Sequence, residues 1–297
     1  MKKILVPTDF SEVSIHAAAL ATEIAQDSRA KLVLLHSAYF NYFNEFSYGV
    51  PFNAQPFIDE LEEAMEEKIQ EFKRKLGPNV EIQTIISSLS LMEAIQDVER
   101  SEKIDLIVVG TQGASGLQER FVGSNTERIV RKTKCPVIAV PSRTTIASIK
   151  KILVPIDILE IQDELMKKLS SLQKFLSASM EFVWVRTPHN VENEAVVRQE
   201  FEALMRTYGF TDCELCIISS LVPTEGILAY AEESRANMIA MATHARRGIS
   251  HLWSGSITED TINHISIPVW TYKLDKDAEN IDLLVLSAKN KEIAQSE

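Results

Sequence analysis

The chain has 297 residues, of which 45% are hydrophobic, and its 42 acidic and 31 basic side chains give a formal net charge of −11. This composition is that of a globular protein with two domains of roughly 140 residues, and the negative charge argues against nonspecific binding to nucleic acid or anionic lipid. We expect a cytoplasmic protein, because no apolar run approaches the roughly 20 residues of a membrane span, the first residues lack a signal-peptide pattern, and three cysteines make no disulfide framework.

The apolar pattern of the first half predicts strands and helices that alternate along the chain. Continuous apolar runs predict buried strands, amphipathic spacing predicts helices, and Gly77-Pro78 is a strong helix stop. In chain order the elements are a strand at 3–7, a helix at 11–26, a strand at 31–36, a helix at 57–76, a strand at 80–87, a helix at 91–101, a strand at 104–109, a helix at 124–134 and a strand at 137–141. This order predicts a parallel sheet, whose ligands bind beyond the carboxyl ends of the strands.

The second half repeats the first. Residues 3–9 recur at 151–157 with an offset of 148, whereas Thr126-Glu127 recurs as Thr258-Glu259 with an offset of 132, so about 16 residues are missing between the first and third strands of the second copy. A period this long indicates a duplicated domain. We expect domains at 1–142 and 150–273, a short linker at 143–149 across which they pack, and a tail at 274–297.

Two segments lie outside the repeat. Residues 38–57 hold eight aromatic side chains and have no counterpart in the second half. They form either a loop packed over a domain or a lid or partner-binding surface. Residues 281–286 of the tail are apolar enough for an added strand or a docking segment.

The spacing Cys213-Glu214-Leu215-Cys216 looks like a redox or zinc motif, but it falls within an expected strand. Residues three apart on a strand point to opposite faces, so we expect the two thiols to diverge and assign no metal site.

Glycines mark a candidate site after the strand at 104–109. Gly110 and Gly113 are followed, after nine intervening residues, by Gly123-Ser124 at a helix start. Glycine lets a ligand approach the backbone and takes φ > 0 freely, and the free amides and dipole of a helix N-terminus bind phosphate. A tight turn with a capping box at Ser124–Glu127 explains the same residues. Asp9 likewise has two interpretations: it is either the N-cap of the following helix or a hydrogen-bond acceptor for a base amine or a ribose hydroxyl.

The string Ile4-Leu5-Val6-Pro7-Thr8-Asp9-Phe10-Ser11, the spacing G-x2-G-x9-G-S and Cys135-Pro136-Val137 together resemble the universal stress protein family, and the whole chain looks like a tandem member. The resemblance implies two doubly wound α/β domains, each a mostly parallel five-stranded sheet flanked by helices, Rossmann-like and similar to the adenine nucleotide alpha hydrolases. It also implies that the last strands, at 137–140 and 267–272, pair within one chain and mimic the family dimer.

The family's nucleotide-binding members imply ATP, with Mg²⁺ on its phosphates, in the first domain. Adenine and ribose would be framed by one group of residues, and ribose and phosphates by a second. The first group is Pro7, Thr8, Asp9 and Ser37, and the second is Val109, Gly110, Gly113, Gly123, Ser124 and Asn125.

The second copy departs from this pattern. Ala242 and Ala245 replace the leading glycines, although Gly255-Ser256 remain. Alanine in a left-handed conformation costs roughly 1–2 kcal/mol, so we expect no useful ATP binding there. Arg246-Arg247 beside the altered loop are either solvated or favour another anion.

Three functions stay open. The first is a stress-response protein in which ATP is a regulatory ligand. The second is a slow ATPase or phosphotransferase, for which the sequence offers no Walker lysine and no catalytic residue. The third is a scaffold that has lost nucleotide binding and acts on protein partners through its surfaces, including residues 38–57 and the tail. An unidentified protein partner and a homodimer both stay open. Intact glycines favour the first, and we expect no enzyme, no metal site of the protein's own, and neither a nucleic acid nor a membrane partner.

Overall fold

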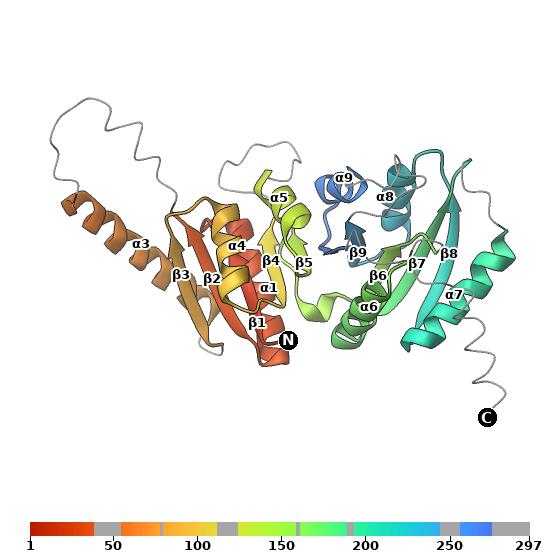
Figure 1. Ribbon diagram of the computed structural model, residues 1–297, viewed down its shortest axis with the longest axis horizontal. Coiled ribbons are helices and arrows are strands. Elements are labelled where there is room, and N and C mark those ends of the chain that lie inside the picture. Colours follow the sequence, from red (N-terminus) through yellow and green to blue (C-terminus); the bar gives the residue numbers. More distant parts are fainter. Residues whose placement is uncertain are drawn as a thin grey trace.

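The computed structural model describes residues 1–38, 55–77, 80–111, 124–158, 161–188, 193–243 and 256–274. Figure 1 shows two α/β halves side by side, in chain order from red to blue. The aromatic segment at 39–54, most of the glycine loop at 112–123, its second copy at 244–255 and the tail at 275–297 lie outside the described residues. Within the described part of the chain, no helix is long and apolar enough to cross a membrane.

The first half alternates strands and helices as the sequence predicts. Its elements are β1 (Lys3–Pro7), α1 (Glu12–Ser28), β2 (Lys31–Ser37), α3 (Gln55–Leu76), β3 (Ile82–Ser87), α4 (Leu91–Ser101), β4 (Leu106–Gly110), α5 (Ser124–Lys132) and β5 (Val137–Val140).

The second half has the same element order. Its elements are β6 (Lys151–Pro155), α6 (Asp163–Leu176), β7 (Ser179–Arg186), α7 (Glu194–Tyr208), β8 (Cys213–Ser219), α8 (Pro223–Glu233), β9 (Met238–Thr243), α9 (Ser256–His264) and β10 (Val269–Lys273). The shortening between the second and third strands is shared between loop and helix, because α7 has 15 residues where α3 has 22.

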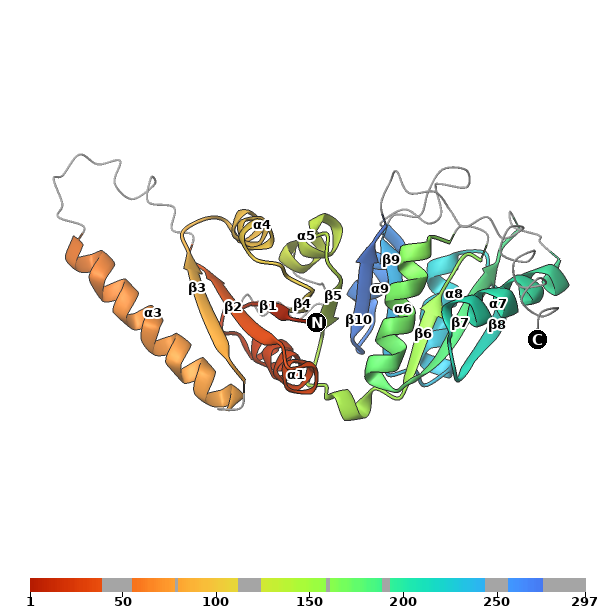
Figure 2. The same ribbon diagram turned by 60° about the horizontal axis from the view of Figure 1, so that its bottom comes forward.

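All ten strands form one sheet in the order β3-β2-β1-β4-β5-β10-β9-β6-β7-β8. Pairing is parallel within each half, as the alternation of strands and helices predicts. The halves meet where β10 runs antiparallel to β5, with Val269 opposite Ala139, Trp270 opposite Ile138 and Thr271 opposite Val137. The expected pair of five-stranded sheets is therefore one continuous sheet in which β5 and β10 are neighbours (Figure 2).

Each face of the sheet is covered by one layer of helices that extends over both halves. Ile4 and Val6 of β1 pack with α1, and the same apolar cluster includes side chains of α3, α6 and α7. Leu5, which points the other way, packs in a second cluster with side chains of α4, α5, α8 and α9. The alternation of strand side chains thus puts an apolar layer on both faces.

The repeat also extends to side-chain contacts that hold the strands. Asp105, just before β4, accepts hydrogen bonds from the backbone amides of Lys2 (2.5 Å) and Lys3 (3.1 Å). Asn237, just before β9, accepts them from Lys150 (3.0 Å) and Lys151 (3.1 Å). A polar side chain at the same place in each copy therefore fixes the start of the first strand.

The linker is docked against the first half. It contains a 3₁₀ turn, η1 (Ile146–Ser148), and the amide of Ile146 donates to Oε2 of Glu23 in α1 at 2.8 Å. Ile149 is almost fully buried. These contacts support the expectation that the two halves pack on each other.

The cysteine prediction is confirmed. Cys213 and Cys216 both lie in β8, where Cys213 packs against the cluster that contains Ile4 and Cys216 against the cluster that contains Leu5. The two thiols therefore lie on opposite faces, and both are free.

Candidate functional site

The carboxyl ends of β1 and β4 lie side by side in the first half. β1 is flanked by β2 and β4, and the helices that follow β1 and β4 leave on opposite faces, α1 on one and α5 on the other. Such a change of direction leaves a crevice beyond the strand ends, where ligands of doubly wound sheets bind. Pro7 ends β1 and is followed by Thr8 and Asp9, and Gly110 ends β4.

Thr8 organises the loop after β1 and is buried. Its Oγ1 lies 2.9 Å from Oγ of Ser14 and accepts the amide of Phe10 at 3.0 Å. Its own amide donates to the carbonyl of Leu35 at 2.9 Å, next to the Pro7–Leu35 pair of β1 and β2. With its hydroxyl occupied in this way, Thr8 shapes the loop. Sequence reasoning missed Ser14, which has no counterpart in the second copy.

Asp9 is exposed at this edge, and it is not the N-cap of α1. That position is held by Ser11, whose side chain accepts the amide of Ser14, while Oδ1 of Asp9 accepts the amide of Ser11 at 3.0 Å. The N-cap interpretation of Asp9 was therefore wrong, because the chain makes one further turn before the helix begins.

Phe10 makes that turn in a left-handed conformation, with φ of 63°. Its ring packs against His36, with ring centroids 4.6 Å apart, and against Phe72, with centroids 5.7 Å apart. A left-handed phenylalanine is strained and is held here by its packing. Anchoring Phe10 inward leaves the neighbouring Asp9 carboxylate at the surface of the crevice.

Ser37 ends β2 beside this loop, as its strand register predicts. Its hydroxyl donates to the carbonyl of Leu89 at 2.8 Å. The hydroxyl proton is thus engaged, which leaves an oxygen that can accept a further hydrogen bond.

Gly110 is required for packing, which sequence reasoning did not foresee. A Cβ at this position would lie 2.9 Å from the backbone carbon, the backbone oxygen and Cγ1 of Val13. The described φ of Gly110 is not positive. Its glycine is explained by the close approach of the first turn of α1. Val109 before it buries its side chain in the core, so only its backbone reaches the edge.

In each half a threonine links the start of a helix to the end of a strand. Oγ1 of Thr126, in the first turn of α5, donates to the carbonyl of Gly110 at 2.8 Å, and Thr258 donates likewise to Ala242 at 3.2 Å. Both threonines are buried. The recurrence of Thr-Glu in both copies was the available signal for this contact. It sets the start of the helix directly against the end of the strand.

The first turn of α5 exposes Ser124 and Asn125. The helix begins at Ser124 and has Glu127 in its first turn. The first turn of α5 carries no basic side chain; Arg128 follows in the second turn, and Arg131 and Lys132 are in the last. The backbone amides and the helix dipole would therefore be the nearest groups to an anion at the helix start. Gly113 and Gly123 lie outside the described residues.

The corresponding edge of the second half is built differently. Ile156 replaces Thr8, and Ile156 and Ile158 are buried in the core. Helix α6 begins only at Asp163, after an N-cap residue, Gln162, whose side chain makes no cap hydrogen bond. Ala242 has no positive φ, so the left-handed strain that the sequence predicted for this alanine was wrong. Because α6 starts later than α1, the second half lacks the helical turn that requires a glycine at position 110 in the first half.

The second half also approaches the candidate site. Thr111, directly after β4, lines a cavity of about 370 Å³ together with Arg235, His264 and Ser266 of the second half. Among the described residues, no group of three or more His, Cys, Asp or Glu side chains is arranged to hold a metal ion.

Comparison with known proteins places the chain in a family. The family model described as the universal stress protein family matches residues 1–141 and 192–273. A universal stress protein of Methanocaldococcus jannaschii is 33% identical over 144 residues, which cover 47% of this chain and 81% of that protein. Another, from Thermus aquaticus, is 32% identical over 140 residues, covering 47% of this chain and 98% of that protein.

Solved structures extend the similarity to both halves. The crystal structure of a universal stress protein from Archaeoglobus fulgidus covers 91% of this chain and 98% of its own, with a TM-score of 0.70 and 20% identity, which shows the fold. A further universal stress protein, solved in complex with cAMP, covers 47% of this chain and 96% of its own at 23% identity and a TM-score of 0.32. The family model matches more than half of the chain over two segments, and the chain is about twice as long as the single-domain relatives, so this protein belongs to the universal stress protein family.

Proposed function

We propose that the first half, residues 1–142, binds one ATP with Mg²⁺ and that ATP acts as a regulatory ligand. The observation that carries the proposal is the Thr126–Gly110 hydrogen bond of 2.8 Å, which holds the start of α5 against the end of β4. The free amides of a first helical turn point along the helix axis, here toward the glycine loop. Phosphate binding at such a helix start needs no basic side chain.

Adenosine would lie across the ends of β1 and β2. The exposed Asp9 carboxylate and the Ser37 oxygen are the groups there that can accept hydrogen bonds, whereas Thr8 shapes the loop beneath them. The proposed set is Pro7, Thr8, Asp9 and Ser37 for adenine and ribose, with Val109, Gly110, Gly113, Gly123, Ser124 and Asn125 for ribose and phosphates.

The second half, residues 150–273, would act as an intramolecular partner that does not bind ATP. Buried Ile156 takes the place of Thr8. Helix α6 starts later than α1, so the second half lacks the helical turn that packs beside the site in the first half. The antiparallel contact between β5 and β10 would supply within one chain the pairing that single-domain members make between two chains. The linker at 143–149 keeps the halves together.

Calorimetric titration with ATP and Mg²⁺ tests the proposal. We expect one site per chain in the wild type and loss of binding in Gly123→Val, because a β-branched side chain would block both the turn and the phosphate. Gly255→Val is the matched control, since Gly255 holds the equivalent place in the second copy. Loss of binding in Gly255→Val alone, or no binding by the wild type, would contradict the assignment.

Hydrolysis is measured separately. If ATP is a regulatory ligand, radiolabelled ATP will be recovered intact after prolonged incubation with stoichiometric protein. Turnover well above the protein-free rate, lost in Gly123→Val, would instead make the protein a slow ATPase.

A further inference from the structure

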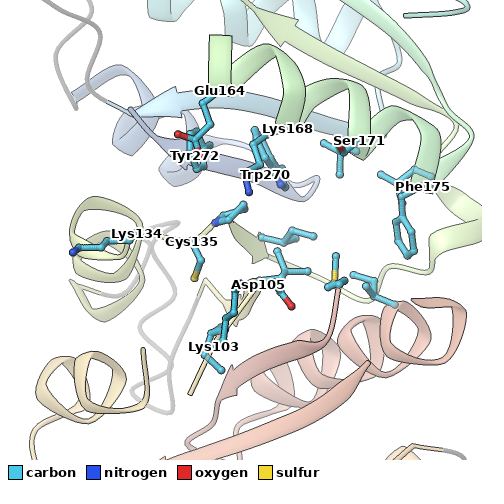
Figure 3. A pocket seen from close by; sticks show the side chains of 18 of the residues that line it. Lys103, Asp105, Lys134, Cys135, Glu164, Lys168, Ser171, Phe175, Trp270 and Tyr272 are labelled. Carbon is cyan, nitrogen blue, oxygen red and sulfur yellow. The ribbon is translucent and has the colours of Figure 1, made fainter. Parts of the chain in front are cut away.

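A cavity of about 530 Å³ lies between the two halves, beside the contact of β5 with β10 (Figure 3). One side is formed by α6, along which Glu164, Lys168, Ser171 and Phe175 follow one another, and the other by the segment before β4 and the residues before β5. Its volume is that of a small-molecule site. It is separate from the crevice proposed for ATP, because its lining includes the amino-terminal approaches to β4 and β5.

The sheet pairing explains why the cavity exists. The ladder between β5 and β10 contains three residue pairs and stops where Thr271 faces Val137. β10 continues through Tyr272 and Lys273, which pair only with β9 on the other side. Helices α1 and α6 flank this joint (Figure 2), and the space between them remains open.

The floor and walls of the cavity are aromatic and aliphatic. Trp270 and Tyr272, alternate residues of β10, face the same way with ring centroids 6.3 Å apart and nearly parallel planes. Phe175 and Leu172 of α6 and Ile138 of β5 complete the apolar lining. Trp270 and Tyr272 are largely buried, so a flat aromatic molecule would contact the parts of these rings that line the cavity.

One cation at this surface has no carboxylate partner. Nζ of Lys168 lies 5.8 Å from the centre of the Tyr272 ring, and within the described residues it makes no ion pair, not even with Glu164 one turn earlier on α6. A lysine head over an aromatic ring at the edge of an apolar cavity would gain from an anion placed beside it.

Two of the three acidic side chains that line the cavity already have hydrogen-bond partners. Asp105 accepts the amides of Lys2 and Lys3, and Glu99 accepts the amide of Lys134 at 3.2 Å and the thiol of Cys135 at 3.5 Å. Glu164 stands at the rim and is exposed.

Two more lysines line the cavity, as does Met1, whose amino group lies near Asp105. Lys103 lies near Asp105, whose charge it helps to stabilise. Lys134 turns its amine away from the other labelled side chains (Figure 3). Lys168 is thus the cation best placed to meet a ligand.

We propose that this cavity binds a small aromatic molecule that carries one anionic group, with its ring against Trp270 and Tyr272 and its anion at Lys168. Nothing in this assignment depends on ATP binding to the first half. The second half, which we propose has lost its nucleotide, would then still contribute β10 and α6 to a ligand site.

A matched pair of fluorescent probes tests the proposal on the full chain. 8-Anilinonaphthalene-1-sulfonate carries the anion, and N-phenyl-1-naphthylamine is the same aromatic scaffold without it. We expect saturable binding of the sulfonate at one site per chain, unaffected by saturating ATP, and at least roughly tenfold weaker binding of the neutral probe, since hydrogen bonds to charged groups contribute about 1.5–3 kcal/mol.

Variants locate the site. Lys168→Gln should lower the affinity for the sulfonate probe by about tenfold and leave the affinity for the neutral probe unchanged. Lys167→Gln is the matched control, because Lys167 is the exposed neighbour on α6, pairs with Asp163 and does not line the cavity. Ser171→Trp fills the cavity from an exposed helix position and should abolish binding of both probes while unfolding by urea stays cooperative.

Three results would overturn the proposal. They are equal affinity of the wild type for both probes, an unchanged affinity of Lys168→Gln for the sulfonate, and displacement of the sulfonate by ATP, which would place the probe in the crevice of the first half. If Ser171→Trp fails to fold, the comparison of Lys168→Gln with Lys167→Gln still tests whether the anion of the probe binds at Lys168.

Discussion

Replacing Gly110 with alanine separates two reasons for a glycine at the end of β4. The sequence suggests that this glycine makes room for the ligand, whereas in the structure it makes room for helix α1. A Cβ there would meet the backbone carbon, the backbone oxygen and Cγ1 of Val13, each at 2.9 Å. Two of these three atoms belong to the helix backbone and cannot rotate away, so α1 or β4 must shift.

The expected loss of stability follows from this geometry. Overpacking a well-filled core costs typically 1–3 kcal/mol. Because rigid backbone makes two of the three contacts, we expect about 2 kcal/mol for Gly110→Ala. Trimming Val13 to alanine relieves only the Cγ1 contact and should not restore stability. A shift of α1 also moves Ser14 away from Thr8, so ATP affinity should fall as a secondary effect.

Urea unfolding without nucleotide measures this effect. Ala242→Gly in the second copy is the control: it removes a methyl group, makes no clash and should cost only about 0.5–1 kcal/mol. The reasoning is refuted if Gly110→Ala unfolds at the wild-type urea concentration. If it does so while losing ATP binding, the glycine serves the ligand.

Other predictions concern the two copies and the titrating groups. Thr126→Val leaves the Gly110 carbonyl without its donor, so it should cost about 1–3 kcal/mol in urea unfolding and weaken ATP binding in calorimetry. Thr258→Val should lower stability without changing the affinity for ATP. Equal effects of the two variants on ATP affinity would argue against a site in the first half alone. Burial opposes ionisation of Asp105, but hydrogen bonds from the amides at the start of β1 outweigh it and lower the pKa of this carboxyl. Ionised Asp105 therefore contributes to the free energy of unfolding above its unfolded pKa of about 3.9. This contribution is lost as the pH falls through the lower folded value. Asp105→Ala should therefore be less stable than wild type at pH 7 and approach it in acid, with Asp105→Asn in between because asparagine does the same job in the second copy; a gap between wild type and Asp105→Ala that stays constant down to pH 2 would contradict this. Burial, reinforced by a neighbouring carboxylate, raises the pKa of Cys135, so iodoacetamide at pH 8 should modify it only after denaturation, as peptide mass spectrometry can show, and rapid modification of the native chain would disprove it.

The sequence predicted the elements well because the strands and helices carry strong and repeated patterns. The strand predicted at 31–36, with its apolar run at 32–35, corresponds to β2 (Lys31–Ser37), and the helix predicted at 91–101 has the bounds of α4 (Leu91–Ser101). The divergence of Cys213 and Cys216 followed from strand periodicity alone.

Predictions failed where a distant contact decides the local conformation. Asp9 has the chemistry of an N-cap, but packing of Phe10 against His36 and Phe72 in a left-handed turn moves the helix start to the residue after Ser11. A turn of this kind leaves no periodic signal in the sequence.

The packing role of Gly110 was missed for a similar reason. Its neighbour Val13 comes from an element almost a hundred residues earlier in the chain, so no local pattern reveals the close approach. Thr126 was visible as part of a recurring Thr-Glu pair, yet its role required knowing that the helix start lies against the strand end. The cavity beside β5 and β10 depends on both halves and could not be read from either alone.

The most direct test of one ATP site per chain, located in the first half, is native mass spectrometry of the full chain with excess ATP and Mg²⁺. We predict that each chain gains the mass of one nucleotide with its metal, that Gly123→Val gains none and that Gly255→Val still gains one. Two nucleotides per wild-type chain, or one that persists in Gly123→Val, would contradict the account.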